Sequence, residues 1–297
     1  MRAGEPRPPA VAGSFYPHDK EGLIESIRQS FRGKLGPGEY SESAFQGKKS
    51  GSIECFIVPH AGYVYSGQVA AHSYFKAREN LGNATEELTV IILGPNHYGI
   101  GSGVALSPSV SWETPLGNLE VNQVLSRKIS QESKITDFDD VSHSREHSIE
   151  VQLPFIQWVL GDKRKVSFVP ICLMLQDRET TSEVADAIFS ALEKNKEKGD
   201  KVLILGSSDL THYEQQEKAS VKDHKLLSSI ESLGVKEYYS TLEGNNVSAC
   251  GYGAIATVML LARMFGKKRG HLLKYATSGD VTEDMSSVVG YSAVHFE

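Results

Sequence analysis

The chain has 297 residues, and its 31 Lys and Arg against 37 Asp and Glu give a formal net charge of −6. This mildly acidic balance predicts no nucleic-acid partner, because nucleic-acid binders usually carry a basic face, and no anionic membrane surface as partner. The longest apolar stretch, residues 254–262, is shorter than the about 20 residues that span a bilayer, and the N-terminus lacks the apolar core of a signal peptide. We therefore expect a globular cytoplasmic protein, and its three cysteines predict no disulfide framework.

The chain begins with a Pro-rich arm that leads into a helix. Residues 7–17 have no regular pattern, but Phe15 and Tyr16 are large for a free tail, so we expect the arm to pack on the body of the protein. Apolar residues at helical spacing predict a helix over residues 20–31. Residues 33–52 are rich in Gly, Ser, Glu and Lys, which is typical of a surface connection.

From residue 55 onward, short apolar runs alternate with helical stretches. The runs are not interrupted by polar residues, which favours strands buried on both faces of a sheet that helices cover. The expected strands are 55–58, 89–93, 166–171, 201–205, 272–277 and 288–295. The expected helices are 66–76, 150–160, 181–193, 219–233 and 253–265. The alternation predicts an α/β fold with a central, mostly parallel sheet flanked by helices, in a single domain over residues 1–297.

Three of the expected strands are followed by polar side chains of a ligand or catalytic type. His60 follows the first strand, His97 the second and Asp209 the fourth, with His212 three residues further on. Ligands bind outside the carboxyl ends of the strands in open α/β sheets, so these side chains are expected to share one crevice. Imidazole suits Fe, Cu, Zn and Ni, and two histidines with one anionic group can form a metal site.

Cys250 stands just before the helix expected over residues 253–265. The positive end of the helix dipole is expected to lower the pKa of its thiol, which makes the thiolate a better nucleophile and a better metal ligand. A small buried residue is the equally weighted alternative. Cys55 and Cys172 lie inside apolar runs and are expected to be packed core thiols.

Residues 143–150 open the helix that is expected to continue to residue 160. His143 and His147 are four residues apart, as are Glu146 and Glu150, so each pair is expected to share one helix face. The order of residues is not the His-Glu-x-x-His zinc motif, and acidic residues in a first turn are also expected from the helix dipole. We favour a supporting or acid–base role for Glu146 or His147 over direct metal ligation.

Several longer motifs resemble those of the Memo family, and the match runs from about residue 10 to the C-terminus. The motifs are Ala12-Gly-Ser-Phe-Tyr16, Val58-Pro-His60-Ala-Gly-Tyr63-Val-Tyr65-Ser-Gly67, Gly94-Pro-Asn-His97, Glu146-His147-Ser-Ile-Glu150-Val-Gln-Leu-Pro154, Ser207-Ser-Asp209-Leu-Thr-His212 and Cys250-Gly251. The resemblance implies a fold similar to that of the class III extradiol dioxygenases, which are non-haem iron enzymes. It also implies that His60, His97 and Cys250 form a metal-binding triad.

The implied triad departs from the dioxygenase pattern in one ligand. Those enzymes hold iron with two histidines and one carboxylate, whereas the Cys250 thiolate is softer and favours copper(I) or zinc more than a carboxylate does. The resemblance therefore implies iron or copper, with zinc as a further candidate, and ring cleavage is not carried over. Animal members are linked to phosphorylated receptor peptides and to redox chemistry, so a small molecule or a peptide is the expected ligand of the crevice.

Three functions remain open at this point. The first is a metal-dependent redox or dioxygenase-like enzyme, in which Asp209, His212 and Glu146 supply protons or orient the metal ligands. The second is a hydrolase with Cys250 as nucleophile, a histidine as base and Asp209 as the orienting group. The third is a binding module that holds a peptide or a small anion in the crevice without turnover.

Overall fold

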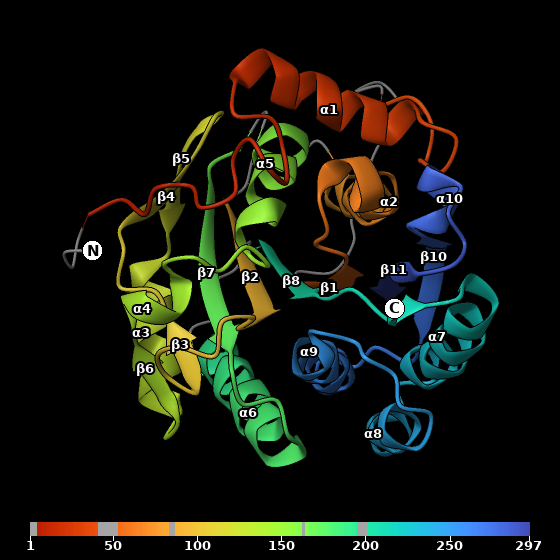
Figure 1. Ribbon diagram of the computed structural model, residues 1–297. Coiled ribbons are helices and arrows are strands. Elements are labelled where there is room, and N and C mark those ends of the chain that lie inside the picture. Colours follow the sequence, from red (N-terminus) through yellow and green to blue (C-terminus); the bar gives the residue numbers. More distant parts are fainter. Residues whose placement is uncertain (1–4, 41–52, 83–86, 162–163, 195–200) are drawn as a thin grey trace.

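The apolar runs of the sequence form the strands at the centre of the protein (Figure 1). The computed structural model describes residues 5–40, 53–82, 87–161, 164–194 and 201–297. The strands are β1 (Ile53–Val58), β2 (Leu88–Pro95), β3 (Val104–Leu106), β4 (Ser111–Thr114), β5 (Gly117–Val121), β6 (Thr136–Phe138), β7 (Val166–Leu173), β8 (Lys201–Ser207), β9 (His212–Glu214), β10 (Gly270–Thr277) and β11 (Val288–Phe296). The α-helices are α1 (Lys20–Arg32), α2 (Tyr63–Leu81), α3 (Gln123–Glu132), α4 (Asp140–His143), α5 (Leu153–Phe155), α6 (Arg178–Lys194), α7 (Gln216–Glu231), α8 (Val235–Gly244), α9 (Tyr252–Met264) and α10 (Gly279–Thr282).

The middle of the sheet is parallel and its outer part is mixed. β1 pairs with β8, β8 with β2, and β2 with β7, all in parallel. β11 runs antiparallel to both β1 and β10, and β3 runs antiparallel to β7. Helices cover both faces of this sheet, with α1 and α2 on one face and α6 and α9 on the other (Figure 1). The predicted α/β fold with a mostly parallel sheet flanked by helices is confirmed.

Successive side chains of the central strands enter two different cores. Ile57 and Ile91 pack with residues of α6 and α9, whereas Phe56 and Val90 pack with residues of α1 and α2. All four side chains are fully buried. Because both faces of these strands are covered, the sequence shows continuous apolar runs instead of polar alternation.

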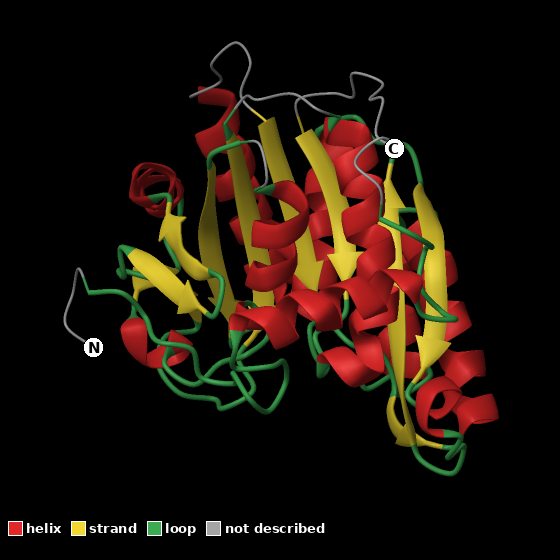
Figure 2. Ribbon diagram, turned by 90° about the horizontal axis from the view of Figure 1, so that it is seen from above, coloured by secondary structure: helices red, strands yellow, loops and turns green. Residues whose placement is uncertain are grey.

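The central strands end at the same edge of the sheet, where long loops gather (Figure 2). The N-terminal arm packs on the body of the protein, as predicted, since Val11 and Tyr16 are buried. It does so at this edge, where the backbone N–H of Tyr63, at the start of α2, donates to the carbonyl oxygen of Phe15 at 2.8 Å. Residues that are distant in the sequence therefore meet at the carboxyl ends of β1, β2 and β8.

The helix predicted over residues 150–160 is not one regular α-helix. It consists of a 3₁₀ turn, Glu150–Gln152, then α5, then a π-helical turn, Ile156–Leu160. Pro154 has no N–H and cannot close an α-helical hydrogen bond to Glu150, which explains the irregular start. Residues 144–149 are not helical at all, so the expected sharing of a helix face across residues 143–150 is wrong.

The sequence pattern did not predict the short and polar elements. They are β3 to β6, β9, α3, α4, α8 and α10, which lack long apolar runs. Of the predicted surface connection, residues 33–40 contain neither helix nor strand, and residues 41–52 lie outside the described residues. Among the helices that the structure describes, none has the length and apolar character needed to cross a membrane.

Candidate metal centre

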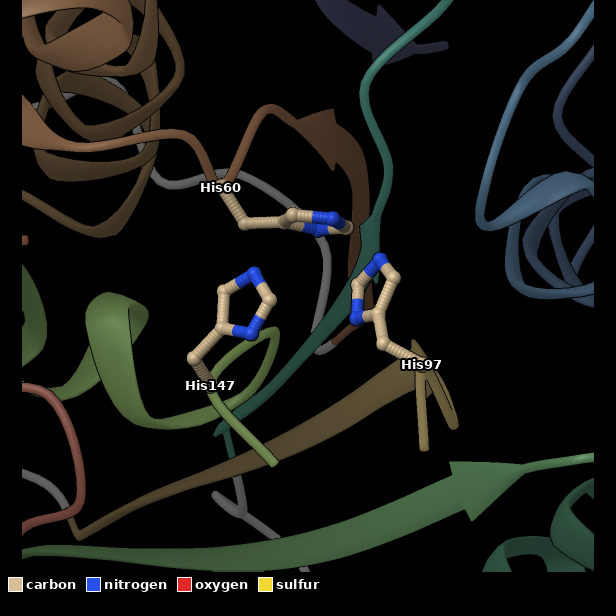
Figure 3. Close-up of side chains that lie close together, drawn as sticks. All are labelled: His60, His97 and His147. Atoms are coloured by element: carbon tan, nitrogen blue, oxygen red, sulfur yellow. The ribbon is translucent and has the colours of Figure 1, made fainter. Parts of the chain in front are cut away.

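Three imidazole rings face one another at the carboxyl edge of the sheet (Figure 3). His60 follows β1, His97 follows β2, and His147 lies in the non-helical segment after α4. One ring nitrogen from each lies within 4.8 Å of the other two. Two metal–imidazole bonds of about 2.0–2.1 Å each span at most about 4.2 Å, so the rings need only a small inward movement to share one ion.

The hydrogen bonds behind His60 determine its tautomer. Its Nδ1 lies 2.9 Å from Ser207 Oγ. That hydroxyl donates its single hydrogen to the carbonyl oxygen of Ser148 at 2.6 Å and accepts a hydrogen bond from the Gln152 amide at 2.9 Å. Ser207 can therefore only accept from His60, which places the proton on Nδ1 and leaves a lone pair on Nε2. This is the tautomer that a metal-binding imidazole requires.

A buried carboxylate fixes the ring of His97. Glu146 Oε1 lies 2.9 Å from His97 Nδ1, and Oε2 accepts from the backbone N–H of His97 at 2.7 Å. The backbone amides of His147 and Ser148 donate to the same carboxylate, each at 2.8 Å. Burial by itself raises the pKa of Glu146, but the hydrogen bond from His97 and the amides lower it to about 2. The ionised carboxylate accepts from Nδ1–H and leaves His97 Nε2 free to bind a metal.

His147 completes the group. Its ring stacks on that of His97 with a centroid distance of 4.5 Å, and it contacts the Phe15 ring, also at 4.5 Å. Burial lowers the pKa of His147 to about 4, against the opposing effect of Glu146. Burial also lowers the pKa of His60 well below its usual value, and the neighbouring histidines add to this effect. Both rings are therefore neutral at pH 7, which is the form that binds metals.

Cys250 lies beside this group. Its Sγ is 3.1 Å from His60 Nε2 and accepts a hydrogen bond from the backbone N–H of Asp209 at 3.3 Å. Because His60 Nε2 carries no hydrogen, the thiol donates to it. In the described part of the chain, the group whose ligand atoms all lie within 4.8 Å of one another contains the three histidines and not Cys250.

The prediction that the helix dipole lowers the pKa of Cys250 is wrong. Burial raises it, and the charge of the neighbouring Asp209 raises it further. Desolvation of a thiolate next to a carboxylate thus outweighs the dipole of α9. Cys55 and Cys172 are fully buried core thiols, as expected.

Asp209 and His212 line the same cleft as His60. Asp209 Oδ1 accepts from the backbone N–H of His60 at 2.8 Å, and burial raises the pKa of Asp209 to about 6. His212 Nδ1 faces two carbonyl oxygens, those of Leu210 at 2.7 Å and Ser248 at 3.0 Å. It must therefore donate through Nδ1, so Nε2 of the neutral ring is a free base. Two groups that can exchange protons thus lie next to the histidines.

One cleft with a volume of about 910 Å³ is lined by His60, His97, His147, Asp209, His212 and Cys250. This volume lies within the range of about 300–1,000 Å³ that is typical of small-molecule sites. Four aromatic side chains line it together with the polar groups, namely Phe15, Tyr65, Tyr213 and Tyr291. The predicted sharing of one crevice by His60, His97, Asp209 and His212 is borne out by their positions along this cleft.

The sequence matches one known protein family over nearly its whole length. A family model described as Memo-like protein matches residues 7–295. The chain belongs to the Memo-like family. It is 44% identical over 290 residues to a MEMO1 family protein of Saccharolobus islandicus, covering 98% of this chain and 99% of the relative. A MEMO1 family protein of Sulfurisphaera tokodaii is 44% identical over 291 residues, again at 98% and 99% coverage.

In this member of the Memo-like family, the residues of segment 143–150 differ in their contacts and in their exposure to the cleft. Glu146 orients His97 and His147 faces the cleft, whereas His143 is fully buried and its Nε2 lies 3.2 Å from the carbonyl oxygen of Ala105. Glu150 is also buried and pairs with Arg7 at 2.7 Å. The sequence analysis favoured a supporting role for His147, because the segment does not match the His-Glu-x-x-His motif, whereas the family resemblance implied Cys250 as the third ligand. The signal in its favour was its place in the motif Glu146-His147-Ser-Ile-Glu150.

Proposed function

We propose that this protein is a metal-dependent redox or dioxygenase-like enzyme. Its iron or copper would be held by His60 and His97 together with His147, Cys250 or both. The proposal rests on one observation: three imidazoles, two of them with Nδ1 already committed to a partner, converge at the edge of a ligand-sized cleft. The hydrogen bonds of His60 and His97 support the proposal, because they hold both rings in the tautomer that a metal ligand requires.

The donor set fits iron, copper or zinc. Imidazole binds all three metals, and the Cys250 sulfur next to His60 adds a soft donor that favours copper(I) or zinc. When bound, iron or copper would supply redox chemistry and Lewis acidity. A set of three protein ligands leaves positions for a substrate, for which the cleft provides the space.

The surrounding residues would bind, orient and exchange protons. Glu146 holds His97 in place through its Nδ1. Asp209, with its raised pKa, and His212, with a free Nε2, are the candidates for taking up or releasing protons of the substrate. The aromatic walls of the cleft suit an organic small molecule or a peptide side chain.

The test is the metal content of untagged protein from metal-replete cells, compared with His60→Ala, His97→Ala, His147→Ala and Cys250→Ser. We expect near-stoichiometric iron or copper in the wild type and its loss in the first two variants. The last two variants decide the third ligand, because the residue that is a ligand loses metal on substitution. His224→Ala, an exposed histidine on α7, is the matched control. Unchanged metal content in all variants would contradict the proposal.

A cysteine-dependent hydrolase is the second candidate, favoured by the 3.1 Å separation of Cys250 Sγ and His60 Nε2. In that case, the thiol proton passes to Nε2 as sulfur attacks a carbonyl carbon of the substrate, and the leaving group takes the proton back. An acylating thiol probe that labels Cys250 stoichiometrically, with activity insensitive to chelators, would support this function instead. Tight peptide binding that chelation does not affect, without turnover, would support a binding module.

A further inference from the structure

We propose that Arg7, in the N-terminal arm, is a positioning residue for the metal centre. It lies outside the cleft and acts through the backbone segment that carries Glu146 and His147. The inference rests on the proposed metal-binding function, and it concerns a residue that no motif of the site includes.

Arg7 is fully buried and uses its guanidinium group to hold segment 143–150. Nε donates to the carbonyl oxygen of His143 at 2.7 Å, and Nη2 donates to the carbonyl oxygen of Glu146 at 2.8 Å. Nη1 donates to the Glu150 carboxylate at 2.7 Å. One planar side chain therefore bonds to the beginning, the middle and the end of the segment.

The segment needs such an external support because residues 144–149 do not form a helix, and the carbonyl groups of His143 and Glu146 are held by Arg7 instead. Buried carbonyl groups that lack a partner are costly, and Arg7 satisfies two of them. The Trp112 ring lies 4.1 Å below the guanidinium carbon and restricts the plane of the group further.

The negative partner of Arg7 is itself fixed by the arm. Glu150 accepts hydrogen bonds from the backbone amides of Ala10 at 2.8 Å and Val11 at 3.0 Å, and from the Tyr16 hydroxyl at 2.7 Å. With Arg7, four donors meet one carboxylate, which fills its capacity. The arm and the segment are thus locked together by one buried ion pair.

The connection from Arg7 to the histidines is short. The carbonyl group that Nη2 holds belongs to Glu146, whose carboxylate bonds to His97 Nδ1 at 2.9 Å. The next residue is His147, whose ring also contacts Phe15 of the same arm at 4.5 Å. A displacement of this backbone would move two of the three imidazoles relative to His60.

Arg7→Lys is the discriminating substitution. Lysine keeps the positive charge beside Glu150, but a single ammonium group at one point cannot reproduce the three-way fork of the guanidinium. Arg78→Lys is the matched control, because Arg78 is also buried, at 1% exposure, and its Nη1 donates to the Gly82 carbonyl oxygen. It lies 15 residues along α2 from Tyr63, the first residue of that helix, which corresponds to about 22 Å of helix.

The experiment measures cobalt(II) affinity and the visible spectrum of the cobalt-loaded protein. It also records the imidazole ¹⁵N signals of the metal-free protein. We expect Arg7→Lys to weaken cobalt(II) binding by roughly 10–100-fold, the loss typical for disturbed outer-shell partners, and to change the cobalt spectrum. The ¹⁵N signals of His97 should move from the Nδ1–H tautomer towards a mixture. Arg78→Lys should match the wild type in all three measurements.

Wild-type affinity and wild-type imidazole signals in folded Arg7→Lys would overturn the inference, as would equal effects in Arg78→Lys. If Arg7→Lys does not fold, Tyr16→Phe removes one donor to Glu150, and unchanged ¹⁵N signals of His97 and His147 in that variant would overturn it instead. If the wild type binds no cobalt(II), the proposed metal function fails, whereas the imidazole signals of the metal-free proteins still decide the role of Arg7.

Discussion

Two groups of side chains that include histidines lie at opposite ends of the same sheet. At the carboxyl ends of β1 and β2, His60, His97 and His147 face a cleft. At the other end, His295 of β11 lies beside Glu54 of β1, with Nε2 2.8 Å from the carboxylate. The Asn80 amide donates to the same carboxylate oxygen at 2.7 Å, and Lys267 Nζ lies 3.6 Å from the other oxygen.

The two groups differ in the hydrogen-bond partners of the imidazole nitrogens. His60 and His97 each commit Nδ1 to a partner and keep Nε2 for the cleft. His295 instead directs Nε2 at a buried carboxylate, and it does not line the cleft. A histidine is therefore a candidate ligand only if one ring nitrogen remains directed at the cleft or at another donor atom that lines it, as His60 Nε2 is at Cys250. The geometry of the first group suits the proposed metal binding, whereas the second group forms a buried network within the sheet.

The largest expected effect is on stability, at the His295 end. Glu54→Ala leaves His295 and Lys267 without their common buried carboxylate. Breaking a buried pair in this way costs about 3–5 kcal/mol. We expect a loss of this size in the free energy of unfolding, measured with denaturant, and no change in metal affinity per folded molecule. Weakened metal binding in Glu54→Ala would show that the two ends of the sheet are not independent.

The next effect concerns the cleft end. Glu146→Gln removes the negative charge that fixes the Nδ1–H tautomer of His97 while keeping the shape of the side chain. We expect metal affinity to fall by roughly 10–100-fold, as measured by competition with a chromophoric chelator. Glu54→Gln, the same change at the other end, is the control and should leave the affinity unchanged.

A third prediction uses His143, which is buried but belongs to neither group. Burial and the nearby Arg7 lower its pKa to about 3. In the unfolded chain, the histidine has a pKa of about 6.5 and binds a proton below that pH, whereas His143 in the folded protein stays neutral. The free energy of unfolding therefore decreases as the pH falls from about 6.5 towards 3. The metal-free protein should therefore lose stability on acidification more steeply than His143→Gln, by up to about 1.4 kcal/mol per pH unit. Parallel curves of unfolding free energy against pH would contradict this expectation.

The smallest expected effect is a difference in alkylation rate between Cys250, at the cleft, and Cys55, at the other end of the sheet. Burial raises the pKa of Cys55, which neighbours Glu54, to about 12, and it also raises that of Cys250. Both should react slowly with iodoacetamide, but Cys250 is only half-buried, whereas Cys55 and Cys172 are fully buried. We expect Cys250 to be alkylated first and to be protected by added metal. Mass spectrometry of the peptides measures the rate at each cysteine. Equal rates for Cys250 and Cys55 would show that the cleft does not expose this sulfur.

Much of the framework could be predicted because it depends on local patterns. Runs such as Thr89–Leu93 and Lys201–Leu205 are long, apolar and ended by Gly or Pro, so both the strands and the residues that follow them were evident. Burial of the arm followed from the size of Phe15 and Tyr16. Elements such as β4 and β5 were missed, since they are short and carry polar residues.

The sequence by itself determined that His60 and His97 follow parallel strands, because strand direction makes the carboxyl ends of such strands neighbours. Only the tertiary structure decided that His147 joins them and that His143 does not. That choice depends on six residues, 144–149, which do not form a helix. Their backbone is supported by Arg7, 136 positions before His143 in the sequence. The tautomers of His60 and His97 and the raised pKa of Cys250 were likewise set by partners distant in sequence. Hydrogen bonding and desolvation act on neighbours in space, and no spacing along the chain encodes them.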